Sequence, residues 1–275
     1  MEDDMASPPP ERPRFDPAVP SVSRITDYLL GGKNNFAADR EAARASLAIA
    51  PELPVLAREG RRFLRRAVGF LAGAGVRQFV DIGCGLPTRD SVHQVLHTVA
   101  PDARVVYVDN DPMVVTHARA LLKDESVVTV VEADARDPER LLTHPRLTAT
   151  IDLGRPVAFL LFSVLTDVTD DVQAMQITTG LQKAMAPGGY LALSHAVRDL
   201  CPDRTARLAA LYQRQGSVTG PYRANLRSRA EVEVFFDGLE LVEPGVVHLP
   251  RWRPDGPGPH HPDAVWVVGG IGRKG

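Results

Sequence analysis

Residues 77–88 decide the fold, and they read RQFVDIGCGLPT. The apolar run at the start of this stretch ends in Asp81, and Gly83 and Gly85 follow it before a Pro-Thr pair that can begin a helix. A second apolar run, residues 104–109, also ends in an acid, Asp109. Strand, glycine turn, helix, strand and acid, in this order, are typical of the first βαβ unit of an open α/β sheet.

Three further strand-like runs, 127–131, 157–162 and 190–195, alternate with helical patterns. Residues 157–162 are continuously apolar, as expected of a central strand that is buried on both faces. Two more strands are predicted at about 241–249 and 264–271, and the loop between them indicates an antiparallel hairpin at the sheet edge. The pattern therefore predicts an α/β fold with a seven-stranded, mostly parallel sheet and an antiparallel last strand.

The sequence divides into a leader, a helical segment and a sheet-forming region. Residues 1–20 are rich in proline and charge and are expected to be disordered. Residues 21–75 carry three helical patterns, which we interpret as an N-terminal helical cap or lid. Residues 76–275 are expected to form the α/β domain, with a helical insertion at about 203–237.

The third helical pattern has apolar residues on one side and five arginines on the other. A solvent-exposed face is the favoured interpretation of such a stripe, and contact with an anion or with RNA is the alternative. The five residues are Arg58, Arg61, Arg62, Arg65 and Arg66.

The composition excludes several classes of protein. The 275 residues carry a formal net charge of −2 and are 44% hydrophobic, which favours a globular protein without affinity for nucleic acid or membranes. Cys84 and Cys201 are isolated, so neither a disulfide framework nor a cysteine metal site is indicated. The longest uncharged apolar run, around 156–165, is too short to cross a membrane, and we expect a cytoplasmic protein. His260 and His261 lie in a loop without rigid spacing, so no metal site is predicted.

Three segments together resemble one known family. Residues 28–39 (YLLGGKNNFAAD), 81–88 (DIGCGLPT) and 106–112 (VYVDNDP) are similar to an actinobacterial family of S-adenosyl methyltransferases that was long catalogued as a domain of unknown function. Gly-Leu-Pro-Thr is the normal form in that family, whereas the wider class I pattern has a third glycine where Pro87 stands. The resemblance implies a Rossmann-like class I methyltransferase fold that includes the helical cap.

The same resemblance implies chemistry. The protein would use S-adenosylmethionine and release S-adenosylhomocysteine. The resemblance does not identify the methyl acceptor, which we expect to be a small molecule. Gly83 and Gly85 would lie against the methionine part of the cofactor, and Asp81 would accept hydrogen bonds from its ammonium group. Asp109 would hold both ribose hydroxyls, since one carboxylate can accept from two donors.

Four further residues complete this expected cofactor site. Asn110 would flank the adenine edge, and Asp134 would accept a hydrogen bond from the adenine amino group. Ala135 would supply a backbone amide to the adenine, and Ser163 would line the methionine pocket. A strand-end aspartate such as Asp134 can equally be a helix cap.

The glycine- and amide-rich segment in the cap has two interpretations. It could cover one end of the sheet, or it could act as a lid in which Tyr28, Lys33 and Asn35, with Asn34 and Phe36, close over the ligand. The density of flexible glycine and polar residues favours the lid.

A general base is needed only where the acceptor must lose a proton. His195, after the fifth strand, is the first candidate because of its position and its natural pKa. A structural histidine is the alternative. Asp167 is the second candidate, although the acids around it could equally cap the next helix.

Two other functions remain possible from the sequence. An NAD(P)-dependent oxidoreductase shares the glycine turn and the ribose acid, but it would need a glycine where Thr88 stands. A non-catalytic protein that binds S-adenosylmethionine would keep Gly83, Gly85 and Asp109 without turnover.

Overall fold

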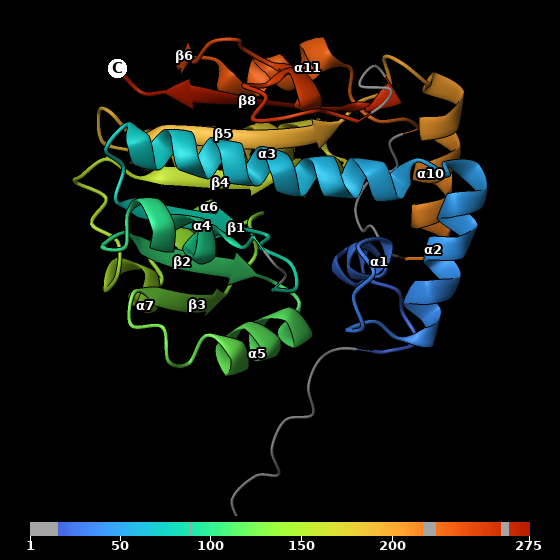
Figure 1. Cartoon of the computed structure of the whole chain (residues 1–275), viewed down its shortest axis with the longest axis horizontal. Helices are drawn as coiled ribbons and strands as arrows, with labels where there is room; N and C mark the ends of the chain where they lie inside the picture. Colours follow the sequence, from blue (N-terminus) through green and yellow to red (C-terminus); the bar gives the residue numbers. More distant parts are fainter. Residues whose placement is uncertain (1–15, 88–89, 217–223, 260–263) are drawn as a thin grey trace, which may run out of the picture.

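The computed structural model describes residues 16–87, 90–216, 224–259 and 264–275. A single sheet of eight strands runs through this part of the chain, with helices on both faces (Figure 1). The strands are β1 Gln78–Ile82, β2 Arg104–Asp109, β3 Val128–Glu132, β4 Ala158–Phe162, β5 Tyr190–Ala196, β6 Glu240–Leu241, β7 Val247–His248 and β8 Val267–Arg273.

The strand order is β3-β2-β1-β4-β5-β8-β6, and β7 also pairs with β8. The first five strands are mutually parallel, so their carboxyl ends meet at one edge of the sheet. The order reverses between β1 and β4, and ligands of open α/β sheets bind in the crevice at such a switch point. The predicted mostly parallel α/β fold is confirmed, and β8 is antiparallel to β5 as expected.

The far edge of the sheet differs from the prediction in one respect. The run predicted as one strand at 241–249 contains two short strands, β6 and β7, which pair with opposite ends of β8. Between them lie Pro244, which has no N–H to give to a ladder, and Gly245, whose φ of +80° turns the chain. The sheet therefore has eight strands instead of seven.

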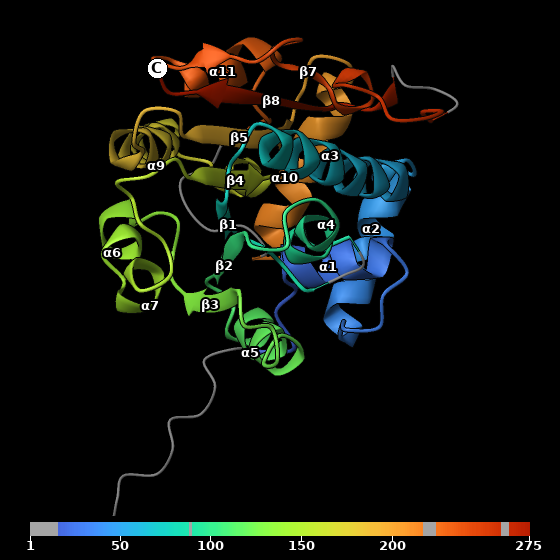
Figure 2. The ribbon, with the colours of Figure 1, turned by 60° about the vertical axis from the view of Figure 1, so that its left-hand side comes forward.

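The helices form two layers on the sheet and a third group beyond the carboxyl ends of the parallel strands (Figures 1 and 2). The bounds in the first layer are α3 Leu53–Gly73, α4 Val92–Val99 and α5 Pro112–Leu121. In the second layer they are α6 Pro138–Leu142, α7 Pro145–Thr148, α9 Asp171–Ala184 and α11 Arg229–Glu233. The third group holds α1 Val22–Leu29, α2 Ala37–Ile49 and α10 Pro202–Arg214.

Three short helices complete the described chain. The single turn α8, Val164–Asp167, follows β4 directly. The other two are 3₁₀ turns, η1 Val234–Phe236 and η2 Leu249–Arg251.

Helix α3 belongs to the core of the sheet. Its residues Phe63, Val68 and Leu71 are fully buried in one hydrophobic cluster with residues of β1, β2 and β5. The sequence assigned this helix to the cap, whereas only α1 and α2 of that segment lie beyond the strand ends (Figure 1).

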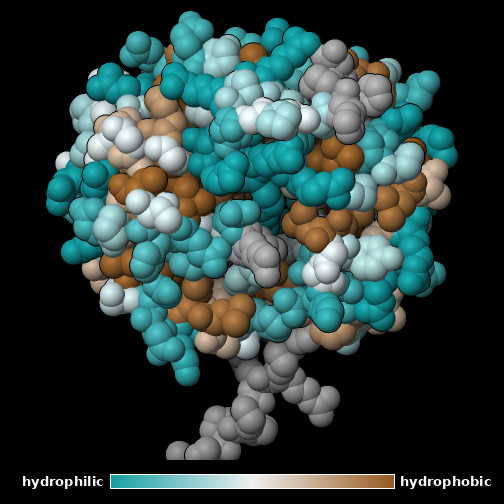
Figure 3. All heavy atoms as spheres, in the orientation of Figure 1, coloured by the Kyte–Doolittle hydropathy of each residue, from teal (hydrophilic) through white to brown (hydrophobic). Residues whose placement is uncertain are grey.

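The face of the molecule in Figure 3 mixes polar and apolar side chains. On the face in Figure 3, hydrophilic side chains predominate and apolar ones are interspersed among them. Over the described ranges, no helix combines the length and the apolar character that a membrane span requires.

We expect Gly269 to be intolerant of any side chain, because β8 is pressed against α3 at this point. A Cβ atom at Gly269 would lie 2.7 Å from Cζ of Phe63 and 2.8 Å from Cδ2 of Leu249. Replacement by alanine should therefore lower the free energy of unfolding by about 1–3 kcal/mol, the usual range for overpacking. Urea denaturation measures this difference. Gly256→Ala is the control, since a Cβ atom there meets nothing within 4 Å, and equal stability of the two variants would contradict the packing described.

Candidate active site

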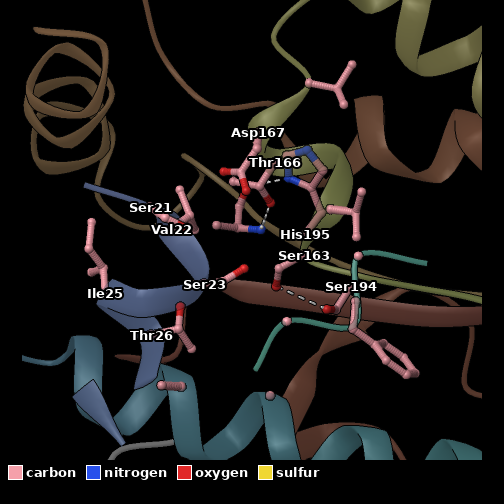
Figure 4. Close-up of a pocket in the computed structure, with 18 of the residues that line it drawn as sticks. Ser21, Val22, Ser23, Ile25, Thr26, Ser163, Thr166, Asp167, Ser194 and His195 are labelled. Carbon is pink, nitrogen blue, oxygen red and sulfur yellow. Dashed lines mark hydrogen bonds between the residues drawn. The ribbon is translucent and has the colours of Figure 1, made fainter. Parts of the chain in front are cut away.

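A cavity of about 560 Å³ lies over the carboxyl ends of the parallel strands, closed by residues of α1, α3 and α10. Its size falls within the range of about 300–1,000 Å³ that is usual for small-molecule sites. Figure 4 shows part of it, with Ser21 and the first α1 residues Val22 and Ser23 facing the segment that follows β4 and the end of β5. The cavity therefore occupies the switch point that the strand order creates.

The glycine turn brings the backbone directly to the cavity floor. Gly83 and Gly85 have φ angles of +68° and +64°, which favour glycine. The N–H groups of Gly83 and Cys84 both donate to the carbonyl oxygen of Val108, at 2.7 and 3.1 Å, and so hold the turn on β2. A Cβ atom at Gly83 would lie only 2.4 Å from Cγ2 of Val164. The turn thus has no room for a side chain at this position.

Asp109 is buried at the end of β2, and backbone groups fix its carboxylate. Oδ2 accepts the N–H of Gly85 at 2.9 Å, and Oδ1 accepts the N–H of Asp111 at 2.9 Å. Burial raises the pKa of Asp109 to about 6, and these two N–H groups oppose the rise. Oδ2 also lies 4.0 Å from Sγ of Cys84, which is a weak donor. A carboxylate has about four acceptor positions, so two hydroxyls can bind when one of them displaces this thiol contact.

Asp81, at the end of β1, has no hydrogen-bonded partner among the described residues. Burial raises the pKa of its carboxyl to about 7; the guanidinium of Arg61 opposes this rise, and Asp109 adds to it. Arg61 extends from α3 and also lines the cavity, and the described chain offers it no hydrogen bond or ion pair. Burial lowers the pKa of Arg61, and the charge of Asp81 partly offsets this. An acid and a base without direct partners thus face the same part of the cavity.

The residues predicted for the adenine end also line the cavity. Nδ2 of Asn110 donates to Oδ2 of Asp134 at 3.3 Å. Arg136 donates to both oxygens of Asp134, through its backbone N–H and its guanidinium. Although burial alone would raise the pKa of Asp134, the hydrogen bonds from Arg136 lower it. Asp134 is therefore already engaged, whereas Asn110 and the neighbouring Ala135 are better placed to meet a ligand.

Ser163 lies where β4 ends, in the left-handed region with φ of +64°. Its N–H donates to the carbonyl oxygen of Ser194 on β5, and the two hydroxyl groups lie 3.3 Å apart (Figure 4). A left-handed conformation is unfavourable for serine and is found mostly at functional sites. Because of this conformation, α8 starts at the next residue, and Val164 packs against Gly83.

The predicted lid residues do not line the cavity. Nδ2 of Asn35 donates to Oδ2 of Asp27 at 2.8 Å and so stabilises its own loop. Tyr28 packs on the small cluster of Ile25, Ala42 and Ala43, and Lys33 is exposed. The segment from Ser21 to Leu30 closes the cavity instead.

Arg24 holds α1 at the carboxyl ends of the parallel strands. Its guanidinium is buried and pairs with Asp39 of α2 at 2.9 Å and with Asp111 at 3.2 Å. The ring of Phe36 lies 5.5 Å from the same guanidinium and packs against Leu86. Breaking a buried ion pair costs about 3–5 kcal/mol, so the cap is firmly held over β2.

The two candidates for a general base differ in their surroundings. Both ring nitrogens of His195 have partners, Nδ1 at 2.5 Å from the carbonyl oxygen of Ala196 and Nε2 at 3.2 Å from Arg227. Asp167 lines the cavity, and none of the described residues hydrogen-bonds its carboxylate. Burial raises the pKa of Asp167 to about 7. These contacts support a structural role for His195 and leave Asp167 as the available base.

Comparison with known proteins agrees with this geometry. A family model described as S-adenosyl methyltransferase matches residues 9–275. The chain belongs to the S-adenosyl methyltransferase family. The family that the sequence resembles is therefore confirmed, together with a methyltransferase that uses S-adenosylmethionine. An NAD(P)-dependent oxidoreductase is not favoured.

Two solved structures are similar to this methyltransferase over nearly the whole chain. A protein of Thermobifida fusca, described as a candidate methyltransferase, is 42% identical with a TM-score of 0.86, covering 94% of this chain and 96% of that one. A DUF574 family protein from Streptomyces avermitilis is 40% identical with a TM-score of 0.87, covering 95% of this chain and all of that one. None of the curated proteins matches the sequence.

The sequence missed Arg61 as a residue of the methyltransferase site. The arginine stripe on α3 was interpreted as solvent-exposed, and this is wrong for Arg61 and also for Arg66, whose guanidinium donates to the carbonyl oxygens of Leu249 and Trp252. The sequence does contain a sign that Arg61 faces inward, because Ala57 and Leu64, one helical turn away on the same side, are small or apolar. His260 and His261 lie outside the described residues.

The raised pKa values of the site acids predict how stability depends on pH. The ordinary value for aspartate is 3.8, so between pH 4 and 7 the folded protein holds protons on Asp81, Asp109 and Asp167 that the unfolded chain has lost. The contribution of these bound protons to the free energy of unfolding is complete below pH 3.8, and it is lost as the pH rises through 6 and 7. Asp81→Asn should therefore be more stable than wild type at pH 8, and this advantage should become smaller at pH 5. Urea unfolding at both pH values measures this, with exposed Asp124→Asn as control. A difference that is independent of pH would contradict the prediction.

Proposed function

We propose that this methyltransferase binds S-adenosylmethionine across the ends of β1 and β2 and transfers its methyl group to a small molecule in the same cavity. The supporting observation is the carboxylate of Asp109, which two backbone N–H groups hold beside the glycine turn and which has only the weak thiol donor of Cys84 as a further side-chain hydrogen bond among the described residues. A carboxylate held in this way can accept from two neighbouring ribose hydroxyls, one of which displaces the thiol.

The tail of the cofactor has matching groups in Asp81 and Arg61. The α-ammonium and α-carboxylate of the methionine part carry opposite charges on one carbon atom. Asp81 and Arg61 carry the opposite pair, face each other across the cavity, and have no direct partner among the described residues. We assign the ammonium to Asp81 and the carboxylate to Arg61, which would restore the charge pairing that both buried groups lack.

The remaining contacts follow from these two. Asn110 and Ala135 are assigned to the adenine, with Asp134 held beside them by Arg136. Gly83 and Ser163 are assigned to the part of the methionine chain next to the sulfur atom. When bound, the sulfonium supplies an activated methyl group. The protein then needs to align the acceptor with the methyl–sulfur bond and to exclude water.

Residues 16–50 are assigned the role of a cap that encloses the ligands. Ser23 of α1 reaches the glycine turn, where its Oγ lies 3.7 Å from the place of a Cβ atom at Gly85. Arg24 holds this segment on Asp111, two residues from Asp109. An enclosed cavity favours a small acceptor over a macromolecular one.

A pair of ligands distinguishes tail contacts from ribose contacts. S-adenosylhomocysteine carries the amino-acid tail, and 5′-methylthioadenosine has the same nucleoside without it. Arg61→Ala should lower the affinity for S-adenosylhomocysteine by about tenfold to a hundredfold, which corresponds to the loss of one charge-assisted hydrogen bond. The affinity for 5′-methylthioadenosine should stay unchanged. Asp109→Asn should lower the affinity for both ligands. Isothermal titration calorimetry measures both affinities.

The matched control is Arg58→Ala on the same helix, since Arg58 is exposed and does not line the cavity. If Arg61→Ala lowered the affinity for both ligands equally, Arg61 would support the shape of the site and would not bind the amino-acid tail. Wild-type protein that binds neither ligand would refute the proposed function itself.

A further inference from the structure

We infer that the methyl acceptor is a protonated amine on an apolar body, and that Asp167 binds its ammonium group and takes its proton. This inference rests on the proposed function, because it assigns the part of the cavity that the cofactor leaves open. That part lies beyond Ser163, between the ends of β4 and β5 and the helices α3 and α10.

The walls of this acceptor chamber are apolar. Leu56 and Leu64 of α3, Phe162 at the end of β4, Leu208 of α10 and Trp266 before β8 all line it. The indole N–H of Trp266 donates to Oε1 of Glu52 at 2.9 Å, so this polar atom already has its partner. A ligand body that fills such a chamber must itself be largely apolar.

The polar side chains of the chamber are almost all engaged with the protein. Tyr212 hydrogen-bonds with Ser46, and Oδ1 of Asn225 accepts from Thr205 at 2.6 Å. Ser163 and Ser194 lie within hydrogen-bond distance of each other.

The groups nearest to Asp167 are engaged in the same way. Thr166 accepts the N–H of Ala196 at 3.3 Å, and both ring nitrogens of His195 have partners. Arg227 donates to the carbonyl oxygens of Leu165 and Val168 and pairs with Asp171.

Among the acidic side chains of the described chamber, Asp167 is the one without a hydrogen-bonded partner. Its carboxylate accepts no hydrogen bond from a described residue, and the phenol of Tyr212 is the titratable group that interacts with it electrostatically. In Figure 4 it lies beside Thr166 and His195 and across from Ser21 and Val22 of α1. A half-buried acid without a partner is unfavourable unless a ligand supplies one.

The charges of the whole cavity point to a second cation. Three ion pairs neutralise charged residues of the cavity lining. Asp134 pairs with Arg136, which also lines the cavity, while Asp111 pairs with Arg24 and Arg227 with Asp171, partners that lie outside the lining. Asp27 is engaged by its own loop through Asn34 and Asn35. The acids left over are Asp81, Asp109 and Asp167, and Arg61 is the one cation left over among the described residues.

The charges of the expected cofactor leave Asp167 without a partner. S-adenosylmethionine has a net charge of +1, from its sulfonium, ammonium and carboxylate groups, and its amino-acid tail pairs with Asp81 and Arg61 in the proposed function. Asp167 lines the cavity near Tyr212 of α10, and the proposed function assigns no group of that ligand to it. A carboxylate is a poor partner for an acidic acceptor and the best one for an ammonium group.

The transfer balances with these groups alone. The ammonium gives one proton to the carboxylate of Asp167, and the freed nitrogen lone pair forms the new N–C bond. The C–S bond breaks and its electron pair stays on sulfur, giving S-adenosylhomocysteine. The product is a methylated ammonium, and the proton on Asp167 leaves to solvent when the site opens. The pKa of Asp167, near 7, suits both the uptake and the release of this proton.

Binding of matched small molecules to the protein saturated with S-adenosylhomocysteine tests the inference. Each set keeps one apolar body and changes its end group: phenethylamine, 2-phenylethanol and phenylacetate; tryptamine, tryptophol and indole-3-acetate; hexylamine, hexanol and hexanoate. Ligand-observed NMR and calorimetry compare wild type, Asp167→Asn, Asp167→Glu and the control Asp124→Asn.

We expect the ammonium member to bind best in the sets that fit, and Asp167→Asn to weaken it about tenfold or more. Asp167→Glu should keep the preference for the ammonium, and every variant should keep its affinity for S-adenosylhomocysteine. Equal or tighter binding of the alcohol or carboxylate, binding of no ammonium compound, or an Asp167→Asn variant with unchanged preference would overturn the inference. Because S-adenosylhomocysteine binding is measured separately, failure here is distinct from failure of the proposed function.

Discussion

The site depends on two hydrogen bonds that fix the carboxylate of Asp109 at the end of β2. One comes from the N–H of Gly85 and the other from the N–H of Asp111, so the glycine turn after β1 and the start of α5 are held on one side chain. This arrangement is possible because parallel neighbours place their carboxyl ends at one edge of the sheet. It orients the carboxylate toward the cavity before a ligand arrives.

The helical cap is coupled to the same point. Asp111 donates its N–H to Asp109 and accepts the guanidinium of Arg24 from α1. Asp39 holds the other side of that guanidinium and also accepts the N–H of Phe36, so both cap helices converge on one buried ion-pair network. Any movement that opened the cavity at α1 would have to break this network or carry Asp111 with it. The cap is therefore part of the architecture of the cofactor site.

Much of the fold follows from local sequence pattern, and the reasons are physical. The glycine turn, the acid that ends each of the first two strands and the apolar run of β4 are short-range signals, so Gly83, Gly85 and Asp109 could be placed from the sequence. The strand predicted at 241–249 is split because Pro244 and Gly245 interrupt an otherwise β-like run. Both residues are visible in the sequence. Whether they end the strand depends on its pairing with β8, which the sequence does not show.

The residues that the sequence could not place depend on long-range packing. Arg61 belongs to a stripe of similar arginines, and only the docking of α3 across the sheet decides which of them faces the cavity. Lys33 and Asn35 were selected by composition, yet the chain folds so that the preceding helix closes the site. The sequence favours His195 over Asp167 because of its position and natural pKa. The structure gives both ring nitrogens of His195 a partner, whereas no described residue hydrogen-bonds the carboxylate of Asp167.

The crystal structure of the protein with S-adenosylhomocysteine tests the central claim most directly. The account predicts both ribose hydroxyls within about 3 Å of the two carboxylate oxygens of Asp109, the usual hydrogen-bond distance. It also predicts the tail carboxylate on Arg61 and open volume between the sulfur atom and Asp167. A nucleoside bound elsewhere, or a carboxylate of Asp109 that makes no contact with the ribose, would contradict it.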